Sequence, residues 1–148
     1  MLFTKRLATS VLSETMLRQR LLQIAINAFG VSLGRNWDFL CAHARIEKYG
    51  YMSIRYFLVR SGVVTEIHPA MGDQGLYRQT LFEERRSFAD EYDVPEWKEA
   101  LILLRGKDQE CSYRTSESGD EGWEKLFTFP QSNLRTRLTE VFDYIDPE

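Results

Sequence analysis

Trp37-Asp-Phe-Leu-Cys-Ala-His-Ala-Arg-Ile46 is the first of three β-prone runs that decide the fold of this chain. The second is Tyr51-Met-Ser-Ile-Arg-Tyr-Phe-Leu-Val59, and the third is Val63-Val-Thr-Glu-Ile67. Short turns that contain Gly50 and Gly62 join the three runs. Consecutive β-prone runs joined by short glycine-containing turns are typical of antiparallel hairpins. We therefore predict a three-stranded β-meander at the centre of the fold.

Both faces of the first two strands are largely apolar. In the first run, Phe39 and Cys41 share one face and Leu40 and Ala42 share the other, because side chains alternate along a strand. A strand that is apolar on both faces belongs in the interior of a sheet, so we expect cover on both sides. The third run is expected to end at His68-Pro69, because proline cannot donate to the strand ladder.

Apolar residues at helical spacing predict three helices that pack on this sheet. The expected helices cover residues 7–33, 76–92 and 132–145. In the first of them, Leu17, Leu21, Ile24 and Ala28 define the expected buried stripe. Residues 70–75 are expected to form a loop that leads into the second helix.

A second β-hairpin is expected after the middle helix. The apolar block Ala100-Leu-Ile-Leu-Leu104 lies between a proline and a glycine-containing turn, which favours a buried strand over residues 97–105. Residues 109–115 are expected to return as its partner, and residues 123–129 are considered as an additional strand. The resulting order, α-β-β-β-α-β-β-(β)-α, predicts an α+β fold in which helices pack on an antiparallel, meander-containing sheet.

Length and composition fit one globular domain over residues 1–148. The chain has 43% hydrophobic and 28% charged residues, and a domain of this size can bury an adequate core without a metal or disulfide. Cys41 and Cys111 are too few for a secreted disulfide framework, although a single bond between them is an alternative to two reduced thiols. No apolar run has the length of a membrane span, and the first residues are too polar for a signal peptide. We therefore expect a cytoplasmic protein.

Charge is distributed unevenly along the chain. The net charge is −3, but residues 1–35 carry +4, residues 36–89 carry +1 and residues 90–148 carry −8. An acidic C-terminal part argues against a nucleic-acid ligand and suits a basic protein partner. The alternative is an acidic surface that only keeps the protein in solution.

The sequence contains no recognisable constellation for metal binding, phosphate binding or triad catalysis. His43 and His68 lie on different predicted strands, and no glycine-rich phosphate loop is present. One pair invites an enzymatic interpretation, because Cys41 and His43 share a strand face and could form a thiolate–imidazole pair. The alternative is a buried cysteine beside a structural histidine. We expect a protein without catalytic activity, cofactor or metal.

Four segments carry a resemblance to a known family. They are Trp37-Asp-Phe-Leu40, residues 51–59, Asp90-Glu-Tyr-Asp93 and Trp97-Lys-Glu-Ala-Leu-Ile-Leu-Leu104. In their order, with a tryptophan opening the first strand, the chain resembles small bacterial immunity proteins that neutralise secreted nuclease toxins. The resemblance implies a protein that binds one folded, basic toxin domain and blocks its activity.

The same order of elements is also similar to that of secretion chaperones for exported effectors, which are small, acidic and dimeric. That resemblance implies a homodimer that binds an unfolded export segment. The oligomeric state is left open by the sequence.

Acidic residues around aromatic side chains define the expected partner-binding surface. The first patch comprises Glu117, Asp120, Glu121 and Glu124 around Trp123. The second patch comprises Asp90, Glu91 and Asp93. Aromatic anchors within a charged surround are typical of protein interfaces, whereas burial of the tryptophan in the core is the alternative.

Overall fold

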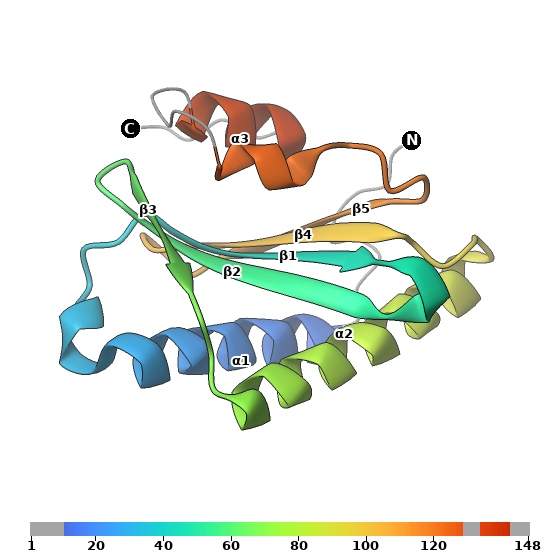
Figure 1. Cartoon of the computed structure of the whole chain (residues 1–148), viewed down its shortest axis with the longest axis horizontal. Coiled ribbons are helices and arrows are strands. Elements are labelled where there is room, and N and C mark those ends of the chain that lie inside the picture. Colours follow the sequence, from blue (N-terminus) through green and yellow to red (C-terminus); the bar gives the residue numbers. More distant parts are fainter. Residues whose placement is uncertain (1–10, 129–133, 143–148) are drawn as a thin grey trace.

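The computed structural model describes residues 11–128 and 134–142, with one five-stranded antiparallel sheet between two layers of helices (Figure 1). The strands are β1 (Phe39–Ile46), β2 (Met52–Arg60), β3 (Val63–Ile67), β4 (Glu99–Arg105) and β5 (Cys111–Ser116). The α-helices are α1 (Val11–Phe29), α2 (Met71–Tyr92) and α3 (Leu134–Phe142). Three short 3₁₀ helices are η2 (Gly30–Leu33), η3 (Lys48–Gly50) and η4 (Trp123–Leu126). The predicted α+β class and the order α-β-β-β-α-β-β-α are confirmed.

The first strand of the meander is the centre of the sheet, whose spatial order is β3-β2-β1-β4-β5. β1 pairs antiparallel with both β2 and β4, so that Ala42 stands between Tyr56 and Ile102. Six consecutive residues of β1, from Phe39 to Ala44, are buried. The prediction that this strand is covered on both faces is therefore confirmed.

One face of the sheet packs against α1 and α2. From β1 this face contributes Leu40, Ala42 and Ala44, which belong to a single buried cluster with apolar residues of both helices. The helical members that are buried in this cluster are Leu17, Leu21, Ile24, Ala25, Tyr77, Leu81 and Phe88. Figure 1 shows the two long helices beneath the sheet.

The opposite face packs against η4 and α3, and it forms a second buried cluster. Phe39 and Cys41 of β1 lie in this cluster with Phe57 of β2. The ring of Phe57 stacks on that of Phe127 with 4.4 Å between the ring centroids. Leu134, Leu138 and Phe142 of α3, Trp123, and Leu126 of η4 complete the cover.

Three details of the predicted elements were wrong. The second helix begins at Met71 and not at residue 76, because the exposed first turn tolerates Gly72 and Gly75 in helical conformation. Residues 123–126 form a 3₁₀ helix and not a strand, because this segment packs across the second face of the sheet. Ala28 is exposed, and Ala25 takes its place in the buried stripe.

The other boundaries differ by a few residues. β4 begins at Glu99 and β5 spans Cys111–Ser116, one to two residues from the expected ends. The first helix ends at Phe29, and the 3₁₀ turn η2 covers the expected last residues. Parts of the first and third predicted helices, at residues 7–10, 132–133 and 143–145, lie outside the described residues.

A single glycine allows the turn after β4 to pack beneath the start of β1. The amide of Gly106 donates to the carbonyl oxygen of Asp38 over 2.8 Å. A Cβ atom at Gly106 would collide with the backbone carbonyl of Trp37. Only glycine fits without a shift of the backbone at this crossing.

We expect Gly106→Ala to lower the free energy of unfolding by about 1–3 kcal/mol, the usual cost of forced overpacking. Thermal unfolding followed by circular dichroism measures the change. Gly72→Ala is the matched control, because a Cβ at helical Gly72 meets no atom within 4 Å. Equal melting temperatures for Gly106→Ala and the parent would contradict the close approach.

Candidate functional site

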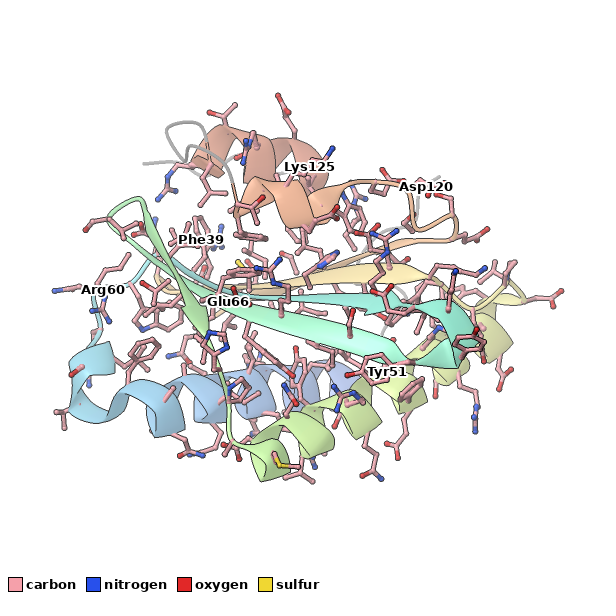
Figure 2. The ribbon with its side chains drawn as sticks, viewed as in Figure 1. Phe39, Tyr51, Arg60, Glu66, Asp120 and Lys125 are labelled. Atoms are coloured by element: carbon pink, nitrogen blue, oxygen red, sulfur yellow. The ribbon has the colours of Figure 1, made fainter. Side chains whose placement is uncertain are left out.

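Two acidic segments that are separate in the sequence come together at one end of the sheet. At this end β1 and β5 finish and β4 begins, as two backbone hydrogen bonds of Lys98 show. Its amide donates to the carbonyl oxygen of Ser116, and its carbonyl oxygen accepts from the amide of Ile46. The C-terminal end of α2 lies at the same end, and Figure 2 shows Asp120 there, away from Phe39 and Arg60. We name as the acidic end the exposed carboxylates Glu47, Asp90, Glu91, Asp93, Glu96, Glu117, Asp120 and Glu121. The two predicted patches therefore lie at the same end of the sheet.

The loop that follows β5 is held in place by two serine hydroxyls. The Oγ atom of buried Ser116 accepts a hydrogen bond from the amide of Gly119 at 3.1 Å. The Oγ atom of Ser118 accepts one from the amide of Asp120 at 3.2 Å. The amide of Glu121 donates to the carboxylate of Glu99 at 3.4 Å. The backbone that carries the carboxylates is thus anchored to the edge of the sheet, so a partner would meet a largely pre-formed surface.

The acidic residues in the last turn of α2 interact unfavourably with the helix dipole. Asp90 and Glu91 lie in the last turn, where the partial charge of the helix is negative and no basic residue is present. Asp93 closes the helix in a left-handed conformation with φ of 53°. Each such carboxylate costs the folded state a few tenths of a kcal/mol up to about 1 kcal/mol. A cationic partner would relieve this local repulsion.

Trp123 does not have the exposed position that the sequence prediction gave it. Its side chain is only 8% exposed and belongs to the second buried cluster with Leu126 and Phe127. The reason is that η4 lies on the sheet, which turns the indole inward. The prediction that Trp123 is an exposed aromatic anchor beside the acidic loop (residues 117–122) was therefore wrong.

Two exposed tyrosines at the same end, Tyr49 and Tyr51, were missed by the sequence prediction, whereas Tyr92 was expected in the buried stripe of the second helix and beside an acidic segment. Tyr49 in the turn between β1 and β2 is fully exposed and has a φ of 68°, a conformation that non-glycine residues rarely adopt. Tyr51, labelled in Figure 2, and Tyr92 at the end of α2 are also exposed. The tyrosine beside Gly50 was the available signal, but it was interpreted only as part of a turn.

A buried ionisable pair lies beneath the acidic loop. The Nε2 atom of His43 is 2.6 Å from a carboxylate oxygen of Glu99, and the two side chains are 5% and 0% exposed. Glu124 also points to this pair, which separates it from the rest of the first predicted patch. No partner for His43 could be predicted, because Glu99 is 56 positions away and only the register of β1 against β4 brings the two together.

The pair of Cys41 and His43 is not arranged as an activated nucleophile. Cys41 is completely buried in the second cluster, and this burial strongly raises the pKa of its thiol. The imidazole of His43 is engaged with Glu99. A nucleophilic thiolate needs a lowered pKa and access to a substrate, and this environment provides neither.

Searches of known protein families and of curated proteins find no match to this chain. Among the described residues, the helices lack the combination of length and apolar character needed to cross a membrane. The geometry of the described surface is therefore the basis for a functional proposal.

We expect neither cysteine of the native protein to react rapidly with a thiol reagent at neutral pH. Cys41 and Cys111 are both buried and reduced, and the raised pKa of Cys41 keeps its thiolate population low until the pH is strongly alkaline. Labelling followed by mass spectrometry, with the denatured protein as the control for two reactive thiols, measures this. Rapid native labelling of Cys41 would instead favour the thiol-dependent enzyme.

Proposed function

We propose that this protein is an immunity-type inhibitor, which binds and blocks a basic nuclease toxin domain through the acidic end. The observation that carries the proposal is the convergence of the two acidic segments, residues 90–93 and 117–121, on one end of the sheet. Loops that are distant in the sequence thereby place more exposed carboxylates than exposed lysines, Lys48 and Lys98, at this end. The resemblance of the chain to immunity proteins supports the same function.

The charge of the partner follows from electrostatic complementarity. A nuclease needs a basic cleft for the phosphate backbone of its substrate, and fixed carboxylates can occupy that cleft in place of phosphates. Opposite charges accelerate association and disfavour partners of the wrong sign. Because these carboxylates are exposed, binding should weaken as salt shortens the screening length to about 8 Å at physiological ionic strength.

Contact area at the acidic end would come from tyrosines. Tyr49 and Tyr51 project from the turn between β1 and β2, and Tyr92 ends α2. Tyrosine is enriched at binding hot spots because it offers a large rigid surface with a polar tip. In the proposed complex these rings form the desolvated contacts, and the carboxylates attract the basic partner electrostatically during association.

We expect the triple variant Glu117→Lys, Asp120→Lys and Glu121→Lys to associate with the cognate toxin about 10- to 100-fold more slowly at low salt. The reason is that reversal of three charges replaces attraction by repulsion. Association rates at two salt concentrations, together with protection of cells from the toxin, measure the effect. The parent rate should fall as salt rises, and that of the variant should not.

The matched control is Glu83→Lys with Glu140→Lys, two exposed carboxylates outside the acidic end. Melting temperatures of all variants must first be shown to equal that of the parent. If the triple variant binds and protects as well as the control at both salt concentrations, the acidic end is not the interface.

A dimeric secretion chaperone is the second candidate, and one observation favours it. The outer face of α2 carries an open groove of about 340 Å³ lined by Gly75, Arg78, Phe82 and neighbouring residues. Leu76 and Phe82 on this helix are exposed apolar side chains. The described part of the protein thus contains an uncovered helix face of the kind that a homodimer of this type requires.

Sedimentation of the parent and of Phe82→Glu separates the two candidates. We expect a monomer of 17.4 kDa for both proteins, since charged Arg78, Glu83 and Arg86 keep this face solvated. Gln79→Glu is the control, because it adds the same charge at a polar position of the groove. A parent dimer that Phe82→Glu dissociates and Gln79→Glu preserves would favour the chaperone.

A further inference from the structure

Three potential metal ligands converge between the sheet and η4. His43 comes from β1, Glu99 from the first position of β4 and Glu124 from η4. One ligand atom from each lies within 4.8 Å of the other two. An imidazole nitrogen and two carboxylate oxygens from three separate elements are thus brought to one point, where a single ion can reach all of them.

The local charge in this cluster is poorly compensated. Glu99 is completely buried, and its carboxylate contacts the imidazole of His43 and accepts a hydrogen bond from the amide of Glu121. A carboxylate oxygen of Glu124 is inaccessible to solvent and accepts no hydrogen bond from any described residue. A fully buried carboxylate beside a second carboxylate with one inaccessible oxygen is unfavourable with so few donors, because loss of hydration is costly unless opposite charge replaces it.

The surrounding arginines provide only part of that charge, at the limit of ion-pair distance for Arg45 and through a longer-range interaction with Glu124 for Arg55. The Nη1 atom of Arg45 is 3.9 Å from Glu124, and both side chains are more than 30% exposed. The guanidinium of Arg55 is engaged by two hydrogen bonds to Glu66, at 2.9 and 2.8 Å. Arg45 can therefore move into solvent at small cost when a more concentrated positive charge binds Glu124.

We propose that His43, Glu99 and Glu124 form a binding site for a divalent transition-metal ion, with Zn²⁺ as the best match. Zinc accepts mixed imidazole and carboxylate ligands at about 2.0–2.2 Å, and three protein ligands with one water complete its tetrahedral shell. Binding replaces the hydrogen bond between His43 and Glu99 by a bond from each of them to the ion. Glu124, whose side chain is 33% exposed, provides the route of entry.

The site would fix the acidic loop to the sheet. Glu124 follows this loop directly, and Glu99 accepts the hydrogen bond of Glu121 within it. A metal ion shared by β1, β4 and η4 would therefore tie the C-terminal end of residues 117–124 to strands of the central sheet. This role is independent of what the acidic end binds, and it holds equally for any partner.

The test is a titration of the purified, chelator-treated protein with Zn²⁺, followed by calorimetry and by thermal unfolding. We expect one saturable site per chain and a rise in melting temperature that EDTA reverses. Glu124→Gln should weaken Zn²⁺ binding by at least about 10- to 100-fold, because loss of a residue that only supports a ligand already costs that much. Because this side chain is partly exposed, the variant should fold even if Glu99→Gln does not.

Glu117→Gln is the matched control, since it removes an acidic side chain from the same loop but not from the cluster. Zn²⁺ binding that is lost in Glu124→Gln and retained in Glu117→Gln supports the site. The absence of a saturable site in the parent, or equal affinities in the two variants, overturns it. Toxin binding is measured separately in EDTA, so failure of the metal site and failure of the proposed inhibitor remain distinguishable.

Discussion

Burial of β1 on both faces is the constraint on which the rest of the structure depends. This strand lies in the middle of the sheet, and its side chains from Phe39 to Ala44 are all buried. A strand in this position needs apolar cover above and below. Exposure of either face to water would lower the free energy of unfolding by about 25 cal/mol for each Å² of apolar surface exposed. The helices α1 and α2 cover one face, and the C-terminal segment from η4 onward must cover the other.

The acidic end is a consequence of this double cover. After β5 the chain has to cross the edge of the sheet in order to reach the second face, and it does so through residues 117–122. The connection from α2 to β4 crosses the same end of the sheet, as Figure 1 shows. Loops avoid burial because their backbone groups need hydrogen-bond partners. The topology therefore gathers both acidic connections on one solvent-facing surface.

Local patterns in the sequence predict the elements of this fold but only part of the candidate site. The unbroken apolar run of β1 and the helical spacing of Leu17, Leu21 and Ile24 indicate burial directly, so the class, the order and most boundaries could be predicted. The pair of His43 and Glu99 depends on the register of β1 against β4. A shift of one residue in this register would place the two side chains on opposite faces of the sheet. The inward position of Trp123 depends on how η4 packs, which no periodicity records.

Several local rules of stability are broken at the same end of the molecule. Tyr49 adopts a left-handed conformation with its side chain in solvent, at a cost of about 1 kcal/mol. Asp90 and Glu91 oppose the dipole of α2, and Glu99 is a fully buried carboxylate. A chain selected for stability alone would lack such features, and those of Tyr49, Asp90 and Glu91 lie on exposed side chains that can be replaced without altering the core. Positive φ does not by itself distinguish this end, because Ser61 and Gln109 in turns at the opposite end share it. The carboxylates that oppose the dipole of α2 are the departure expected where stability has been exchanged for binding, because departures from local consistency cluster at functional sites.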